Sequence, residues 1–268
     1  MGGIDSSFAG SIPGLYERYL VPLLFQPYAD EVARRVAEWK PSRVLETAAG
    51  TGVVAAAMHA AAPDADIVAT DLNQAMLDVA ADHIRSGKVR FQEADALDLP
   101  FDDGSFDLVV CQFGVMFFPD KVRGNAEARR VLSEGGRYLT VIWDSIDKNP
   151  GSRKLGDAVA SLFPDDPPKF LERTPFGYSD RAQIEHDLLA AGFADIELET
   201  VAKRSRGGSA RDVATGLCMG SPLRSEIEER DSSKLYDAVD AATAALMPLE
   251  GVMGFDAPMS AHIVTAIR

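Results

Sequence analysis

The stretch RVLETAAGTGVVAAAM, from Arg43 to Met58, decides how the rest of the chain is organised. A short apolar run leads into small residues and glycines, and then into an alanine-rich segment. This order predicts a strand, a tight turn and a helix, because glycine lacks a Cβ and lets a ligand approach the backbone closely. Gly50, Gly52 and Ala55 also fit the G-x-G-x-x-G/A spacing of dinucleotide-binding turns. The turn therefore predicts a nucleotide-like ligand.

The residue that ends the apolar run is acidic. Glu46 stands at the predicted strand end, close to where a dinucleotide enzyme places a pyrophosphate. A carboxylate repels an anion at this position and attracts an ammonium or a sulfonium. An ordinary tight turn between a strand and a helix also explains the glycines, so the turn alone does not identify the ligand.

Short β-rich runs alternate with helical patterns from Arg43 to Asp144. This alternation is typical of βαβ units and predicts an α/β fold with a doubly wound, mostly parallel, seven-stranded sheet. We expect strands at 43–46, 66–70, 89–93, 107–112, 136–143, 194–203 and 260–268. We expect helices at 53–61, 74–86, 121–132, 182–191, 210–219 and 222–247, the third of these closed by Gly135 and Gly136.

The whole chain, 1–268, is expected to form a single domain. Residues 1–42 are interpreted as an N-terminal helical cap, in which Pro41 ends the last helix before the first strand. Two segments interrupt the alternation, one rich in Pro and Asp at 150–178 and one with helical patterns at 207–259. Because a final strand follows them, we interpret both as insertions that form a lid over the carboxyl ends of the strands and select the substrate.

Charge and cysteine usage restrict the partners and the compartment. The formal net charge is -14, which repels phosphate backbones and anionic lipid, so we expect no nucleic acid and no membrane partner. Cys111 and Cys218 are interpreted as reduced, packed thiols. The stretch MGGIDSSFAG lacks a basic and an apolar signal region, and no apolar run reaches the ~18 residues that span a bilayer. A cytoplasmic protein is therefore expected.

Two further acidic residues follow predicted strands. Asp71, in IVATDLNQAM, is placed so that its carboxylate can accept from vicinal ribose hydroxyls, a role common to nicotinamide and S-adenosyl ligands. Asp95, in FQEADALDLPF, can accept from an exocyclic adenine amine, with Ala96 and Leu97 covering the ring edge. The alternative for Asp95 is a helix or turn cap.

Together these residues resemble the class I S-adenosylmethionine-dependent methyltransferases, in particular the small-molecule branch similar to ubiquinone and menaquinone C-methyltransferases. The resemblance covers about Val44 to Trp143. The segments that carry it, in order along the chain, are VLETAAGTG, ATDLNQAML, EADALDLPFDDGSFDLVVCQFGVMFFPD and RRVLSEGGRYLTVIW. The chain departs from the family pattern at Ala49 and Glu134, and neither departure touches a polar contact.

The resemblance implies S-adenosyl-L-methionine as cofactor and methyl transfer, by in-line displacement, to an oxygen, nitrogen or carbon of a small molecule. It implies Glu46 near the methionine amino group, and Ala48 and Gly50 along the cofactor backbone. The residues that it places around the cofactor are Tyr19, Glu46, Ala48, Gly50, Asp71, Leu72, Met76, Asp95, Ala96, Gln112 and Phe113.

Roles for the remaining positions follow from the same resemblance. Asp71 would bind the ribose, and Leu72 and Met76 would flank the adenine, with Asp95 and Ala96 at its polar edge. In the fourth motif, Gln112, Phe113 and Gly114 would lie beside the reacting methyl group. From the N-terminal segment, Tyr16 or Tyr19 would close the site, although burial in an amphipathic helix explains both tyrosines equally well.

No catalytic base and no metal site is predicted. A sulfonium is an activated leaving group, so positioning and exclusion of water can supply much of the catalysis. A base is needed only where the acceptor must lose a proton, and none of the four histidines is expected at the mouth of the site. These histidines are His59, His83, His186 and His262, the last at the start of the final strand.

Two alternatives remain beside the methyltransferase. An NAD-dependent oxidoreductase is favoured only by the glycine spacing and lacks a Tyr-x-x-x-Lys or another hydride-transfer pattern. A non-catalytic S-adenosylmethionine-binding protein would keep the same motifs. Acceptor choice is assigned to the insertions, where the acidic run Glu226–Asp231 is interpreted as a solvated helix face. An adaptable apolar wall is expected there from Met219, Leu223, Leu246, Met247 and Met253.

Overall fold

The computed structural model describes residue 10 and residues 12–268, which leaves most of the stretch MGGIDSSFAG and the start of the expected cap outside the described residues. The chain divides into two compact units. We call one the sheet unit; it comprises Tyr28–Trp143, Tyr178–Val201 and Ala261–Arg268. We call the other the helical unit; it comprises Met1–Pro27, Asp144–Gly177 and Ala202–Ser260.

Strands and helices alternate in the sheet unit. The long strands that belong to it wholly or in part are β1 (Arg43–Glu46), β2 (Asp66–Asp71), β3 (Val89–Glu93), β4 (Phe106–Gln112), β5 (Leu132–Trp143), β6 (Asp195–Arg206) and β8 (Gly254–Ile267). Its helices are α2 (Gln26–Trp39), α3 (Val53–Ala61), α4 (Gln74–His83), the 3-10 turn η3 (Val115–Phe117), α5 (Lys121–Val131) and α8 (Arg181–Ala190).

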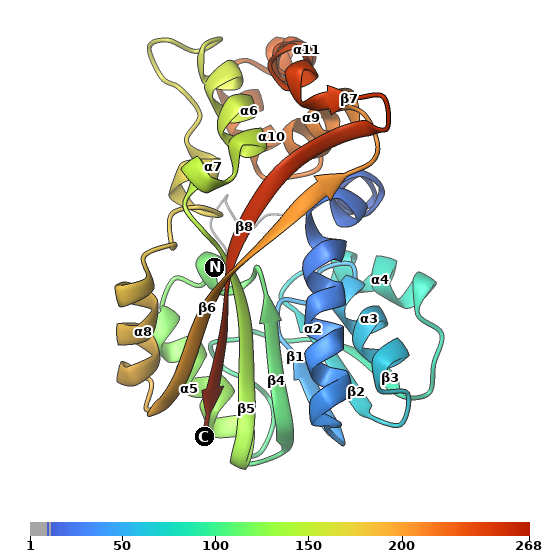
Figure 1. Ribbon diagram of the computed structural model, residues 1–268, viewed down its shortest axis with the longest axis vertical. Helices are drawn as coiled ribbons and strands as arrows, with labels where there is room; N and C mark the ends of the chain where they lie inside the picture. Colours follow the sequence, from blue (N-terminus) through green and yellow to red (C-terminus); the bar gives the residue numbers. More distant parts are fainter. Residues whose placement is uncertain (1–9, 11) are drawn as a thin grey trace. The chain divides into compact units, whose positions relative to one another are not determined.

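Within the described residues the sheet has the strand order β3-β2-β1-β4-β5-β8-β6, with the short β7 paired to β8 beside this path. Strands β1 to β5 pair in parallel, and β8 runs antiparallel to β5. In Figure 1, α2, α3 and α4 lie to one side of these strands, and α5 and α8 lie to the other. The expected α/β fold with a doubly wound, mostly parallel sheet is confirmed.

The centre of this sheet is apolar on both faces. In β1, Leu45 lies opposite Val68 of β2 and Val109 of β4, and all three are buried. Continuous apolar runs are typical of parallel strands that helices cover on both sides. This burial fixes the register of β1, β2 and β4, and with it the place where each strand ends.

The helical unit is built from short elements. They are α1 (Ile12–Leu15), the π-helix η2 (Tyr16–Phe25), η4 (Ile146–Lys148), α6 (Pro150–Ala160), α7 (Phe170–Arg173), α9 (Ala210–Met219), α10 (Leu223–Asp231), η5 (Ser232–Lys234), α11 (Leu235–Leu246), η6 (Met247–Leu249) and β7 (Glu250–Gly251). Helix α11 packs against α6 and α9, and α9 packs against η2. The expected insertions, 150–178 and 207–259, fall almost entirely within this unit, and their role as a lid stays a prediction.

Several expected boundaries were wrong. The glycine pair Gly135 and Gly136 does not close α5, which ends at Val131; β5 begins at Leu132, ahead of the glycines. Its pairing with β4 jumps from Leu132 to Arg137, so the glycines lie in a strand irregularity. The helix expected over 222–247 is broken after α10, where the Asp231 side chain accepts a hydrogen bond from the backbone N–H of Ser233.

The acidic run of α10 is not wholly solvated. Glu226, its first member, is 6% exposed and accepts hydrogen bonds from the backbone N–H groups of Lys169 and Phe170, at 2.8 and 3.0 Å. The Arg173 guanidinium donates to its other oxygen at 2.7 Å. The interpretation of the whole run as a solvated face was therefore wrong at Glu226, because this side chain caps the N-terminus of α7.

Candidate functional site

The turn after β1 is held by both neighbouring strands. The backbone N–H of Thr47 donates to the Val110 carbonyl of β4, and that of Ala49 donates to the Thr70 carbonyl of β2, each at 2.9 Å. Ala48 has a φ of 54°, in the left-handed region that side chains with a Cβ rarely adopt. An alanine in this conformation is strained, and the two inter-strand hydrogen bonds keep it there.

Glu46 points into the protein at the end of β1. It is 1% exposed, and its Oε2 atom has no hydrogen-bond partner among the described residues. The backbone N–H of Ala55, in the first turn of α3, donates to the same carboxylate. Burial, and secondly the nearby charge of Asp71, raise the pKa of Glu46 well above its ordinary value. Both causes favour the neutral form of the Glu46 carboxyl, and a cationic ligand beside it would favour the ionised form.

Asp71 ends β2 and is bound to the turn after β1. Its Oδ2 accepts a hydrogen bond from the backbone N–H of Gly50 at 2.8 Å, and its Oδ1 accepts one from the backbone N–H of Asn73 at 2.8 Å. Burial raises the pKa of Asp71, and these N–H groups oppose the increase. Asp71 thus also anchors the glycine turn, a contact that the sequence pattern did not predict. The Oδ1 atom also accepts from the Asn73 side-chain amide at 3.3 Å, whereas Oδ2 keeps a second lone pair for a ligand hydroxyl.

The positions expected around an adenine ring differ in exposure. Leu72 is 48% exposed, although it is a large apolar residue, whereas Met76 is buried within α4. Asp95 is exposed, and its Oδ1 accepts a hydrogen bond from the backbone N–H of Leu97 at 2.9 Å. This bond is the turn cap that was the alternative for Asp95. Ala96 follows it and is partly buried.

The loop after β4 carries a second residue in the left-handed region. Phe113 has a φ of 55° and is buried, as is Gln112 before it. The Phe113 ring stacks on Trp143 with centroids 3.9 Å apart and planes 10° apart. Tyr28 meets both rings edge-on, at 5.3 and 5.6 Å. Neither Tyr28 nor Trp143 was predicted at this site from the sequence, although Trp143 ends the fifth strand and so lies at the same edge of the sheet.

The turn after β1 and the loop after β4 are in direct contact. A Cβ on Gly114 would lie 2.5 Å from the Ala48 Cβ and 2.8 Å from the Cys111 sulfur, so only glycine allows this approach. Glu46, Ala48, Gly50, Asp71, Gln112 and Phe113 thus belong to linked turns at one edge of the sheet. Tyr19 lies in η2 of the helical unit, and its expected part in the site stays a prediction.

The four histidines lie on helices or within a strand and not in these turns. His59 lies on α3, His83 ends α4 and His186 lies on α8. His262 lies inside β8 and not at its start, because the strand begins at Gly254; its ring bonds with the Thr200 hydroxyl and the Ser179 carbonyl. Among the described residues, no group of three His, Cys, Asp or Glu side chains could hold a metal ion.

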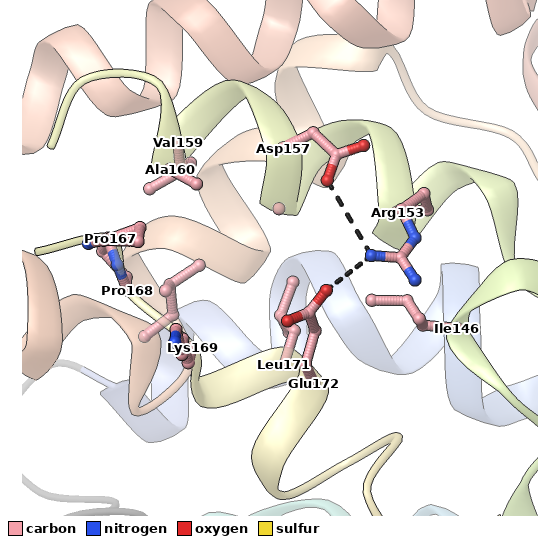
Figure 2. Close-up of a pocket in the computed structure, with 12 residues that line it drawn as sticks. Ile146, Arg153, Asp157, Val159, Ala160, Pro167, Pro168, Lys169, Leu171 and Glu172 are labelled. Carbon is pink, nitrogen blue, oxygen red and sulfur yellow. Dashed lines mark hydrogen bonds and ion pairs between the residues drawn. The ribbon is translucent and has the colours of Figure 1, made fainter. Parts of the chain in front are cut away.

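The helical unit has a pocket of its own, of about 120 Å³ (Figure 2). Arg153 at one wall donates to Glu172 at 2.5 Å and to Asp147 at 2.8 Å, so its charge is compensated. The apolar part of the lining consists of Ile146, Gly156, Val159, Ala160, Pro167, Pro168, Leu171 and Leu223. This pocket suits an apolar group better than an ion.

Comparison with known proteins supplies the family. Residues 44–136 match the model of a methyltransferase domain. The chain is 46% identical over 101 residues to a demethylmenaquinone methyltransferase of Deinococcus radiodurans, covering 37% of this chain and 42% of that protein. It is 35% identical over 179 residues to the demethylmenaquinone methyltransferase of Clavibacter sepedonicus, covering 61% of this chain and 70% of that protein. The chain belongs to the class I S-adenosylmethionine-dependent methyltransferases.

The fold of this methyltransferase agrees with solved structures. Phosphoethanolamine N-methyltransferase 2 of Haemonchus contortus, in complex with S-adenosyl-L-methionine, has a TM-score of 0.59 at 17% identity, covering 96% of this chain and 56% of that chain. Family membership confirms S-adenosyl-L-methionine as the cofactor. The residues fit it, because the unpartnered Glu46 oxygen suits an ammonium group and the Asp71 oxygens suit hydroxyls.

Proposed function

We propose that this methyltransferase methylates a small, apolar, quinone-type acceptor. The observation that carries the cofactor half of the proposal is the buried carboxylate of Glu46 with an unpartnered oxygen beside Asp71. The acceptor half is supported by the two relatives, both demethylmenaquinone methyltransferases, of which the chain spans 42% and 70%.

We assign some residues of these turns to binding the cofactor and others to aligning its methyl group. We assign Glu46 to the methionine ammonium, the backbone of Ala48 and Gly50 to the methionine chain, and Asp71 to the ribose hydroxyls. The donor supplies a methyl group on a sulfonium that is already an activated leaving group, so the protein's own task is alignment and exclusion of water. We assign that task to Gln112 and to the buried Phe113.

We propose that the adenine ring is bound by apolar side chains on its faces and by polar groups at its edge. Leu72 and Met76 are assigned to the ring faces, and Asp95 and Ala96 to its polar edge. The exposure of Leu72 supports this assignment, because an apolar side chain half in solvent is stabilised when a flat ring covers it. No residue is assigned as a general base.

We propose that the helical unit, with Tyr19 and residues 150–178 and 207–259, acts as the lid and selects the acceptor. Support comes from its apolar pocket, which Leu223 lines, and from the exposure of Met247 and Met253. Leu246 is fully buried and belongs to the core of this unit.

Polar replacement of the half-buried Met219 should lower turnover or shift the preferred acceptor without changing S-adenosylhomocysteine affinity. Parallel loss of melting temperature, affinity and turnover would instead make Met219 a core residue.

We also propose a cytoplasmic protein with a small-molecule partner and no nucleic acid partner. The buried free thiols of Cys111 and Cys218 support a reducing compartment. The net charge of -14 disfavours binding to a phosphate backbone. Among the described residues, no helix is long and apolar enough to cross a bilayer.

The experiment that tests the proposal separates cofactor from acceptor. Calorimetry should show saturable binding of S-adenosylhomocysteine and none of NAD; the reverse result would rule out the assigned cofactor site. Incubation with S-adenosylmethionine and a panel of quinols, phenols, amines and carboxylates, analysed by mass spectrometry, should show methylation of the quinols. Methylation of another class would refute the acceptor, and tight binding without any turnover would favour a non-catalytic binding protein.

A further inference from the structure

A buried sulfur lies between the turn after β1 and the loop after β4. Cys111 is fully buried in β4, and its sulfur accepts hydrogen bonds from the Thr47 hydroxyl and from the backbone N–H groups of Gly114 and Val115. Burial raises the pKa of Cys111 to about 11, so the side chain is a neutral thiol near neutral pH. It is therefore a hydrogen-bond acceptor rather than a nucleophile in this position.

The same sulfur limits how the loop can move. Gly114 approaches so closely that an added Cβ would lie 2.8 Å from it and 2.5 Å from the Ala48 Cβ. Between Cys111 and Gly114 stands Phe113, whose left-handed backbone is disfavoured for a residue with a large side chain. The bonds that follow Phe113, from Gly114 and Val115 to the sulfur, oppose its relaxation to an extended conformation.

We propose that Cys111 is a positioning residue for methyl transfer. Its sulfur ties the loop Phe113–Val115 to the turn after β1, and so sets where Gln112 and Phe113 stand beside the reacting methyl group. This role rests on the proposed function, since the assignment of Gln112 and Phe113 belongs to it. The stacking of Phe113 on Trp143 reports the loop position independently of any acceptor.

The experiment uses this reporter. The chain has two tryptophans, so Trp39→Phe leaves Trp143 as the single emitting indole. In that background, Cys111→Ala removes the acceptor atom, and Cys111→Ser replaces it with an oxygen that accepts the same N–H bonds. Cys218→Ala is the matched control, because Cys218 is equally buried and lies on α9 of the helical unit. Emission of Trp143, melting temperature, S-adenosylhomocysteine affinity and turnover are measured for each variant.

We expect Cys111→Ala to change the Trp143 emission and to lower turnover about tenfold, while affinity falls less than about threefold, because misplacement costs rate more than binding. Cys111→Ser should restore the emission and most of the turnover. Cys218→Ala should lower the melting temperature but leave the Trp143 emission of the folded protein unchanged. If Cys111→Ala does not fold, Thr47→Val removes one donor to the sulfur, and a smaller change in the same direction is expected.

The proposal is overturned if Cys111→Ala leaves the Trp143 emission unchanged, as Cys218→Ala does, or leaves turnover unchanged, or if Cys111→Ser behaves like Cys111→Ala. In the Thr47→Val case, unchanged emission overturns it. Failure of the proposed function is a separate result: if the unsubstituted protein methylates no acceptor, the Trp143 emission and the affinity still decide whether Cys111 holds the loop.

Discussion

Two buried glutamates, one in each unit, differ in how their carboxylate oxygens are hydrogen-bonded. Glu226 of the helical unit is 6% exposed, and its two oxygens accept from two backbone N–H groups and a guanidinium. Glu46 of the sheet unit is 1% exposed, and one of its oxygens has no partner among the described residues. A buried charge is costly unless it is paired. The Glu226 carboxylate therefore holds parts of the fold together, and the unpartnered Glu46 oxygen is the one that we assign to the methionine ammonium.

Removing the Glu226 carboxylate is expected to have the largest effect, and that effect is on stability. Glu226→Ala removes one hydrogen-bond acceptor from the backbone N–H groups of Lys169 and Phe170 and from the Arg173 guanidinium, so the free energy of unfolding should fall by about 2 to 3 kcal/mol. Denaturant unfolding measures the loss. S-adenosylhomocysteine affinity of the folded variant should not change, and a comparable loss of affinity would show that Glu226 serves the ligand.

A second test concerns Asp71, which has one role in the fold and one proposed role in ligand binding. Asp71→Ala removes the acceptor of the Gly50 N–H and the proposed acceptor of the ribose hydroxyls, each worth ~1.5–3 kcal/mol for a charged group, so affinity should fall at least about tenfold. Calorimetry with S-adenosylhomocysteine measures it. Asp71→Asn is the control, because it keeps one oxygen for Gly50; unchanged affinity in a folded Asp71→Ala protein would remove Asp71 from the site.

A third test uses the raised pKa of Glu46. A carboxyl whose pKa is raised on folding stabilises the free protein below its unfolded pKa, and this contribution is lost as the pH rises through the folded pKa. A bound ammonium would favour the ionised form, so affinity for S-adenosylhomocysteine should increase as the pH rises above the ordinary carboxyl pKa. Glu46→Gln should flatten this dependence, and an equal slope in both proteins would refute the pairing.

These contrasts show which features the sequence predicts. Strands β1 and β3 and helix α3 were placed residue for residue, because apolar runs and a glycine turn are local signals. The positions of Glu46 and Asp71 at strand ends followed from the same pattern. Periodicity alone did not show that Glu226 faces α7, because an acidic helix face has the same pattern whether or not one member meets a neighbour.

The remaining features depend on contacts between distant residues. The Asp71 carboxylate reaches Gly50, and Phe113 stacks on Trp143, only because β1, β2, β4 and β5 end side by side. Tyr28 joins that cluster from α2, far earlier in the chain. Gly135 and Gly136 were misplaced for a related reason: a glycine pair looks the same in a helix stop and in a strand irregularity.

The smallest expected effect is on cofactor affinity, and it concerns the exposed side chain of Leu72. Leu72 is 48% exposed in the sheet unit, and Val252 is 103% exposed in the helical unit, so replacing either by serine removes little buried surface. If an adenine ring covers Leu72, Leu72→Ser should lower S-adenosylhomocysteine affinity about fivefold, since partial burial of a leucine is worth roughly 1 kcal/mol. Val252→Ser should leave affinity unchanged, and neither variant should shift the melting temperature by more than about 2 °C. Adenosine alone should show the same loss with Leu72→Ser, because it retains the ring and ribose but lacks the methionine that Glu46 is assigned to hold. Equal affinities of the two serine variants would place the adenine elsewhere and leave the exposed Leu72 unexplained.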